Sequence, residues 1–206
     1  MPRQNRVTPF SALVAVSERG TLMGNRGCLH DDRGQIRRAF QGRRWIICRL
    51  SFKGRRRIVM TPGQYTELFF LDEATALAAG HRPCAECQRE RFNLFRDYWR
   101  QAHGGGRPAA TEIDAALHAE RTSEAARRAH LCESLAGQPD GVMLTDDEQH
   151  AYLAANGRLF RWSAGGYEPA QAGRLRLPAR LLTPAAILRV LRAGYPVDIH
   201  PSAGGV

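Results

Sequence analysis

The sequence contains almost no lysine and no long apolar segment. Lys53 is the only lysine, so nearly all of the 30 basic residues are arginines. None of the apolar runs approaches the roughly 20 residues that a helix needs to cross a bilayer. The run at residues 11–16 is shorter than the apolar core of a secretory signal. Internal repeats and low-complexity segments are also absent. The sequence therefore excludes a membrane-spanning protein and a repeat protein, and we expect a cytoplasmic protein that has no membrane partner.

Cysteine is scarce and irregularly spaced. The five cysteines are an odd number, and they form no regular framework of the kind that disulfide-stabilised secreted domains show. We therefore expect reduced thiols, as in the cytoplasm.

The chain is strongly basic and long enough to fold. Its 206 residues are 43% hydrophobic, which suffices for one good core or for two small lobes around it. The formal net charge is +10. Arginine suits bidentate contacts with phosphate, although a GC-rich genome would also enrich it. The charge therefore allows a nucleic-acid partner without requiring one.

The first third of the chain has the pattern of short strands separated by Gly, Asp or Arg turns. The strand-like stretches cover residues 7–16, 21–29, 45–52 and 57–60, with a further one at 67–71. They predict a mainly antiparallel sheet. A short helix follows, with Asp72 as its N-cap and Gly80 at its end. A long core helix is predicted from Cys84 to about Gln101, because apolar residues recur there at helical spacing.

Helical and strand patterns alternate in the second half. Residues 111–136 predict one or two helices, and Asn156-Gly157 predicts a hairpin between two short strands at 151–154 and 158–162. Another short strand is expected at 142–144. Thr183 and Pro184 mark the start of a last helix, and an irregular tail follows.

Together these patterns predict an α+β fold. It consists of an antiparallel N-terminal sheet with a zinc-binding-like motif, central helices and a small C-terminal β unit. We place the first unit at residues 1–138 and the second at residues 139–206, and we expect them to pack as one compact body.

Cys84 and Cys87 form a Cys-x-x-Cys pair within the segment His-Arg-Pro-Cys-Ala-Glu-Cys at residues 81–87. Two thiols at this spacing can hold one metal ion, and a helix N-terminus lowers the pKa of a thiol, which favours the metal-binding thiolate. Zinc usually takes four ligands in a structural site, so the pair supplies half of them. A redox dithiol and two buried small side chains are the alternatives.

The block around this pair resembles the Ada-type metal-binding domain of bacterial DNA-alkylation-repair proteins, and a related module attached to some bacterial nucleases. In that pattern a double-aromatic strand leads into an Ala-rich helix and then into Gly-aromatic-Arg-Pro-Cys-x-x-Cys. The matching residues are Phe69, Phe70, Ala78, Ala79, Gly80, Arg82, Pro83, Cys84 and Cys87. The resemblance implies zinc held by the two cysteines. The chain departs from the pattern because it lacks the closely spaced upstream Cys pair that supplies the family's other ligands.

More broadly, residues 24–30, 52–57 and 65–87 are similar to a family of bacterial proteins, a likeness that implies neither a reaction nor a substrate.

The other metal ligands are sought upstream of the pair. Cys28 and His30 form a Cys-x-His segment at the end of a predicted strand, which is a suitable place for ligands. A loop histidine bonded to a nearby carbonyl is the alternative for His30. Cys48 lies in an apolar strand pattern and is interpreted as a core residue. The predicted zinc ligands are Cys84, Cys87, His30 and Cys28.

Four basic residues gather at a turn between two predicted strands: Lys53, Arg55, Arg56 and Arg57. Such a turn can lie along a phosphate backbone, and each contact adds salt-sensitive affinity through counterion release. An ordinary solvated turn is the alternative. We predict DNA or RNA as the partner and these four residues as the contact.

His118 and Glu120 offer a catalytic alternative. With Cys84 and Cys87 they contain the parts of a zinc-dependent base deaminase, in which one His and two Cys hold zinc and a Glu moves the proton. The order of the motifs is reversed, so the chain would be circularly permuted. A metal-dependent hydrolase or nuclease would add Asp31, Asp32 and His30.

The sequence thus predicts a zinc-containing protein that binds or processes nucleic acid, with the zinc mainly structural. It leaves open whether the chain is an enzyme.

Overall fold

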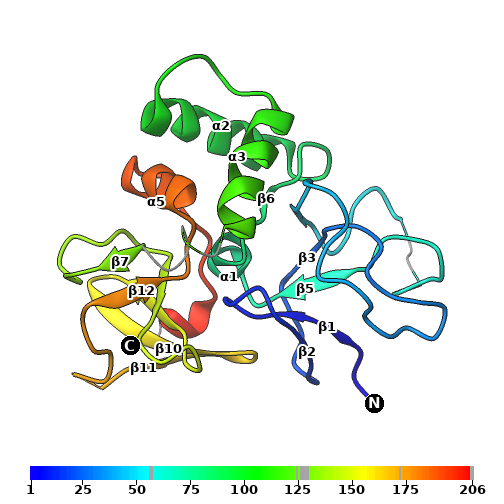
Figure 1. Cartoon of the computed structure of the whole chain (residues 1–206), viewed down its shortest axis with the longest axis horizontal. Coiled ribbons are helices and arrows are strands. Elements are labelled where there is room, and N and C mark those ends of the chain that lie inside the picture. The colour runs from blue at the N-terminus through cyan, green and yellow to red at the C-terminus, as the bar shows by residue number, and fades with distance from the viewer. Residues whose placement is uncertain (56–57, 124, 126–129, 172, 205–206) are drawn as a thin grey trace.

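The computed structural model describes residues 1–206 except 56–57, 124, 126–129, 172 and 205–206. Its strands form two six-stranded sheets, which lie on opposite sides of the short helix α1 (Glu73–Ala78) in Figure 1. Three further helices lie above them in this view: α2 (Arg89–His103), α3 (Ala110–Thr122) and α5 (Ala185–Arg192). The α+β prediction is confirmed.

The N-terminal sheet has the strand order β2-β1-β5-β3-β4-β6. Its strands are β1 (Gln4–Val7), β2 (Leu13–Ala15), β3 (Leu22–Asn25), β4 (Ile46–Cys48), β5 (Leu68–Phe70) and β6 (Arg82–Pro83). The sheet is mixed, because β1 pairs with β5 and β4 pairs with β6 in parallel, while its other pairs are antiparallel.

The stretch at residues 7–16, predicted as one strand, is a hairpin instead. The chain turns between β1 and β2, where Thr8 N donates to the carbonyl oxygen of Ala12 at 3.0 Å. Ser11 adopts a φ of 65°, a left-handed conformation that ends a strand. The stretch predicted at 57–60 forms no strand in its described part.

The second sheet is antiparallel throughout, with the order β11-β10-β9-β8-β12-β7. Its strands are β7 (Leu131–Cys132), β8 (Val142–Thr145), β9 (Tyr152–Ala155), β10 (Arg158–Ser163), β11 (Gly166–Pro169) and β12 (Ala179–Leu181). The Asn156-Gly157 hairpin is confirmed, since both residues have positive φ as this turn requires. The boundary at residue 138 stays a prediction, but β7 lies before it and belongs to this sheet.

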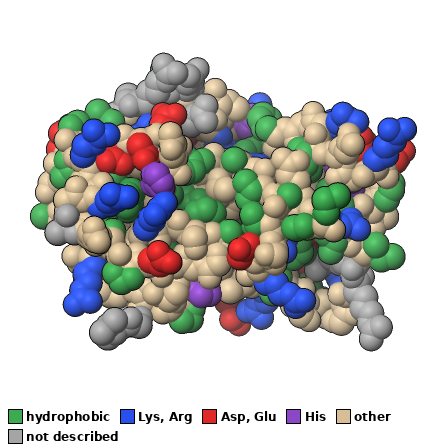
Figure 2. All heavy atoms as spheres, turned by 90° about the horizontal axis from the view of Figure 1, so that it is seen from below, with side chains coloured by type: hydrophobic (Ala, Val, Ile, Leu, Met, Phe, Trp, Pro, Cys, Tyr) green, Lys and Arg blue, Asp and Glu red, His purple; other side chains and the backbone are tan. Residues whose placement is uncertain are grey.

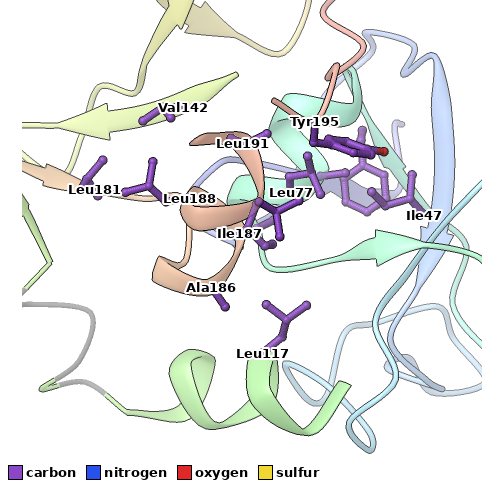
Figure 3. Packing of buried hydrophobic residues seen from close by; sticks show 14 of the residues in the cluster. Ile47, Leu77, Leu117, Val142, Leu181, Ala186, Ile187, Leu188, Leu191 and Tyr195 are labelled. Carbon is purple, nitrogen blue, oxygen red and sulfur yellow. The ribbon is translucent and has the colours of Figure 1, made fainter. Parts of the chain in front are cut away.

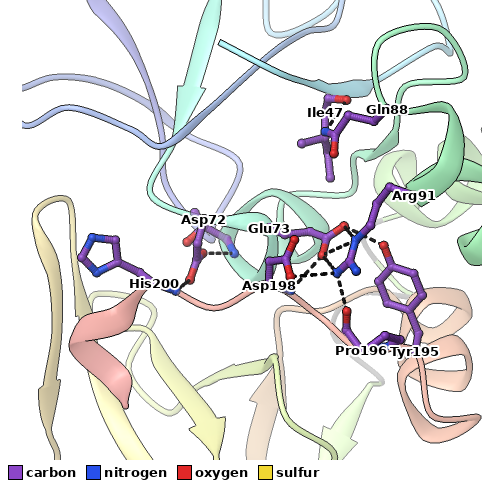
Figure 4. Close-up of polar contacts among 10 residues, drawn as sticks. Ile47, Asp72, Glu73, Gln88, Arg91, Tyr195, Pro196, Asp198 and His200 are labelled. Atoms are coloured by element: carbon purple, nitrogen blue, oxygen red, sulfur yellow. Dashed lines mark hydrogen bonds and ion pairs between the residues drawn. The ribbon is translucent and has the colours of Figure 1, made fainter. Parts of the chain in front are cut away.

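Helix α1 carries two buried acidic residues that anchor the end of the chain (Figure 4). Asp72 caps the helix as predicted, accepting a hydrogen bond from Thr75 N at 2.8 Å, and its other oxygen accepts from His200 N at 2.9 Å. Glu73 accepts from the Tyr195 hydroxyl at 2.7 Å and is paired with Arg91. The irregular tail, which includes a short 3-10 turn at Pro201–Ala203, is therefore held against α1.

One core joins the two sheets through the helices (Figure 3). Leu77 of α1 lies near Ile187 and Leu191 of α5, and the cluster extends from Ile47 in the first sheet to Leu181 in the second. Burial of this apolar surface is the main stabilising contribution to the fold. Among the described helices none is long and apolar enough to cross a membrane.

Candidate metal centre

Cys84 and Cys87 lie in the turn between β6 and α2, before the long helix begins at Arg89. The parallel pairing of β6 with β4 continues into this turn, because Cys84 N donates to the carbonyl oxygen of Ile47 at 2.9 Å. The same carbonyl accepts from the Gln88 side chain at 3.0 Å, a contact that Figure 4 shows. These bonds fix the turn against the end of β4, where the next residue is Cys48.

Three cysteine sulfurs meet at this point. The Sγ atoms of Cys48, Cys84 and Cys87 all lie within 4.8 Å of one another, and all three residues are buried. In a tetrahedral zinc site with Zn–S bonds of about 2.3 Å, the sulfurs would be about 3.8 Å apart. The spacing and the thiol chemistry therefore fit a zinc ion or another thiophilic metal.

Hydrogen bonding distributes the protons of these thiols unequally. The pKa of Cys84 lies well below its ordinary value because the Cys48 and Cys87 thiols hydrogen-bond to its sulfur, assisted by the Glu86 backbone N–H at 3.4 Å. The pKa of Cys48 is raised because its thiol hydrogen-bonds to Cys84 and to Cys87. A sulfur that already favours the thiolate is suited to begin metal capture, after which the metal would displace the other protons.

An apolar layer surrounds the sulfurs. Met23 is buried with the three cysteines, and Ile46, Phe52 and Phe69 pack against them. Such a layer would limit the access of water to a bound metal and strengthen its bonds to thiolates. Within the part of the chain that the structure describes, these cysteines are the only group of His, Cys, Asp or Glu residues with metal-binding spacing.

Cys28 and His30, the predicted upstream ligands, are placed elsewhere. His30 uses both ring nitrogens, since Nδ1 lies 2.6 Å from Thr66 Oγ1 and Nε2 lies 3.2 Å from the Thr61 carbonyl oxygen. The Cys28 thiol lies 3.7 Å from the carbonyl oxygen of His30. The structure thus brings Cys84 and Cys87 together with Cys48, and not with Cys28 or His30. Sequence reasoning interpreted Cys48 as a core residue because it lies in an apolar strand, and so did not identify it as a possible metal ligand.

The residues of the catalytic alternative also have other contacts. Glu120 accepts a hydrogen bond from Ala186 N at 3.0 Å, at the start of α5. His118 packs edge-on against Phe40, with 5.4 Å between the ring centres. Asp31 is paired with Arg37. None of these residues belongs to the described cysteine group.

The predicted basic turn begins at Lys53, five residues after Cys48. Lys53 and Arg55 are exposed and lie 5.2 and 5.4 Å from the centre of the Phe52 ring. Arg55 is also paired with Glu86 at 2.8 Å, between the two motif cysteines. Arg56 and Arg57 lie outside the described residues. The turn is therefore attached to the metal centre through Phe52 and Glu86.

Comparisons of the chain with protein-family models, with curated proteins and with solved structures gave no match. The resemblance to the Ada-type domain stays a prediction.

Proposed function

We propose that the chain is a zinc protein whose metal, bound by Cys48, Cys84 and Cys87, supports a basic surface loop that contacts nucleic acid. The meeting of these three sulfurs within 4.8 Å supports the proposal most directly. The ion would connect the end of β4 to the turn before α2, two segments that are far apart in sequence. A crosslink of this kind stabilises a fold by closing a long loop.

The contact loop is residues 49–55, which we call the basic loop. It leaves the metal centre at Cys48 and carries Arg49, Lys53 and Arg55 on its exposed side. Leu50 is also half exposed, and Ile58, which follows the loop, is 80% exposed. Positive charge beside exposed apolar side chains is typical of a surface that binds a polyanion and also covers part of its bases.

The net charge of the chain does not by itself identify this loop as the nucleic-acid contact. On the face that Figure 2 shows, Lys and Arg side chains lie in separate groups among acidic and hydrophobic ones. The basic loop is favoured because the metal centre would fix its base. A fixed set of cations loses less conformational entropy on binding.

The metal is tested by elemental analysis of the purified chain and of two serine variants. We expect about one zinc ion per chain in the parent and in Cys28→Ser, and loss of the metal in Cys48→Ser. Cys28→Ser is the matched control, because its thiol lies outside the cysteine group. A folded parent that contains no metal after expression with zinc, or equal retention in both variants, would refute the site.

The nucleic-acid contact is tested by the salt dependence of binding to a short DNA duplex and to a single-stranded RNA. Replacing Lys53 and Arg55 with Gln should lower the slope of log affinity against log salt by up to about 1.8 on duplex DNA if each contacts a phosphate. Arg161→Gln, at an exposed arginine on β10, is the control. An unchanged slope, or no binding at low salt, would refute the contact even if zinc is present.

A catalytic metal is the second candidate, favoured by the observation that the described cysteine group supplies three ligands. Zinc in catalytic sites keeps one of its four positions for water or substrate. X-ray absorption spectroscopy would separate the two. Three sulfurs with one exchangeable oxygen or nitrogen favour catalysis, whereas four ligands that do not exchange favour the structural role.

A further inference from the structure

A large cavity lies between the two sheets, away from the cysteines. Its volume is about 940 Å³, and none of the residues that line it is a cysteine. The β1–β2 turn, the end of α1 and the end of α3 line one side, and β12 with the residues before α5 lines the other. The volume lies in the range of about 300 to 1,000 Å³ that is typical of small-molecule sites.

Two arginines in the cavity wall form no ion pair with a carboxylate in the part of the chain that the structure describes. The guanidinium group of Arg26, which is 1% exposed, donates to the hydroxyl and carbonyl oxygens of Ser11 at 2.6 and 3.0 Å. Arg121 donates to the carbonyl oxygens of Gly80 and Arg43 at 2.6 and 2.8 Å. The Nε atom of each arginine is buried without a hydrogen-bond partner. Buried cations are normally paired with an anion, whereas here the charge of Arg121 is offset only through space by the carboxylates of Asp114 and Glu120.

The two arginines share one aromatic ring. Arg121 Cζ lies 4.1 Å and Arg26 Cζ 4.5 Å from the centre of the Trp45 ring. Burial lowers the pKa of each arginine to about 10. For Arg121 the charge of Asp114 opposes this fall, and the charge of Arg26 adds to it. Both stay charged at neutral pH. A bound anion would offset the free-energy cost of burying these charges and would reduce the repulsion between them.

Two acidic residues line the cavity, and each has a hydrogen-bond or ion-pair partner. Glu120 accepts from the backbone of Ala186 at 3.0 Å, and Glu148 lies 3.5 Å from Arg180 Nε. His130 also lines the cavity, and burial lowers its pKa, so it adds no positive charge at neutral pH. Among the described residues, Arg26 and Arg121 are therefore the lining cations that form no ion pair with a carboxylate.

The cavity also offers an aromatic surface. Phe40 lines it and is 36% exposed, so part of its ring is open to a ligand. Its ring centre lies 5.6 Å from that of Trp45. A flat ring that stacked on Phe40 would place an attached anionic group within reach of Arg121.

We propose that this cavity binds a phosphorylated nucleoside, with the phosphate at Arg121 and the base against Phe40. Arg26 acts behind Trp45 as a second positive charge and does not touch the ligand, because it is almost fully buried. The phosphorylated nucleoside is either a free mononucleotide or the terminal nucleotide of a nucleic acid. Both present the same chemistry to the cavity.

Calorimetric titration tests this proposal with defined probes. These are each of the four nucleoside 5′-monophosphates, the unphosphorylated nucleosides, inorganic phosphate and a 5′-phosphorylated trinucleotide. We expect at least one phosphorylated nucleoside to bind at least about tenfold more tightly than its nucleoside or than phosphate alone. Binding of the mononucleotide identifies a free nucleotide as the ligand. Binding of the trinucleotide alone identifies the end of a nucleic acid. No binding by any phosphorylated probe would overturn the proposal.

Two variants locate the binding. Phe40→Ala removes an exposed side chain and should weaken nucleotide binding by about fivefold or more. Arg121→Gln should weaken it by about tenfold or more. Arg161→Gln, outside the cavity, should have no effect. Metal content should be unchanged in Phe40→Ala, which separates this test from that of the zinc site. If Arg121→Gln does not fold, Phe40→Ala still decides, because unchanged affinity in a folded Phe40→Ala protein contradicts the proposed position.

Discussion

The two sheets bury different kinds of side chain. In the second sheet β8 and β9 are buried along their whole length, and Thr145 and Tyr152 are their only residues with a polar side-chain group. In and beside the first sheet, by contrast, buried polar or charged residues are frequent: Asn5, Arg26, His30, Thr66, Glu67, His81 and Arg82. The second sheet is held by packing, whereas the first depends on specific polar partners.

This difference indicates where the chemistry lies. A buried polar group costs free energy unless it has a partner, so a sheet that buries many is retained for what those groups do or hold. Arg82 illustrates the satisfied case, because it forms two hydrogen bonds of 2.9 and 2.8 Å with Asp114. The cysteine cluster and the Arg26–Arg121 pair are the cases in which an external ion or ligand would supply the missing partner.

The largest expected effect is that of metal loss, and it should be confined to the first sheet. Zinc binding contributes about 10 kcal/mol or more in zinc-finger peptides, so its removal should destabilise the segments it joins. After treatment with a chelator we expect hydrogen exchange to accelerate in β4 and β6 while β8 and β9 keep their protection. Equal acceleration in both sheets would contradict the contrast between them.

A packing defect in the second sheet should lower the stability of the protein and leave its metal content unchanged. Leu153 on β9 is fully buried, so Leu153→Ala should lower the free energy of unfolding by about 2 to 5 kcal/mol. Metal content should stay at the parent level, because Leu153 packs in a different hydrophobic cluster from Cys48, Cys84 and Cys87. Denaturant unfolding with elemental analysis of the folded variant checks both expectations. Loss of zinc in this variant would show that the two regions are not separable.

Local signals in the sequence predict much of the fold. The N-cap at Asp72 and the Asn156-Gly157 hairpin are correct, because each depends only on a few neighbouring residues. Phe92, Phe95 and Trp99 are buried on one side of α2, as their spacing predicts. The strands β6, β11 and β12 were not predicted, and β7 lies in the stretch at residues 111–136 that was wrongly predicted to be helical there. Strands of two to four residues carry too little pattern to be recognised.

Of the three cysteines in the candidate site, the sequence predicted only the two that are close together in the chain. The Cys-x-x-Cys spacing identifies Cys84 and Cys87, but Cys48 joins them through the parallel pairing of β4 with β6, which brings distant segments together. An apolar strand around a cysteine looks the same whether the thiol is a core residue or a ligand. The Arg26–Arg121 pair was not predicted for a similar reason, because the two arginines are far apart in the sequence and only the fold brings both to the Trp45 ring.

A moderate effect is expected from His81, which is fully buried in the first sheet and has no hydrogen bond on either ring nitrogen. Burial, with the charges of Arg26 and Arg121, lowers its pKa well below the ordinary value of about 6.5, although the backbone of Ala76 and Ala79 opposes this. Below about pH 6.5 the unfolded chain therefore binds a proton that the folded chain does not. Stability should fall by up to about 1.4 kcal/mol per pH unit as the pH decreases through this range.

The variant His81→Leu isolates this contribution. Between about pH 5 and 6.5 the free energy of unfolding of the variant should depend less steeply on pH than that of the parent, by a difference of up to one bound proton. Above that range the two slopes should be equal. Both proteins are measured with zinc present, because proton competition for the thiolates affects both alike. Parallel curves for the two proteins would show that the ring is charged in the folded state.

The smallest effect is expected from His118→Ala, which separates the structural metal from a permuted deaminase site. His118 lies on α3, its ring packs against Phe40, and it is not part of the cysteine group in the described chain. We therefore expect the variant to keep its zinc and to lose about 1 kcal/mol of stability or less. In a deaminase the histidine would be a ligand, so zinc would be lost with it. Elemental analysis of the folded variant distinguishes these outcomes, because the proposed site uses Cys48, Cys84 and Cys87 and does not include His118.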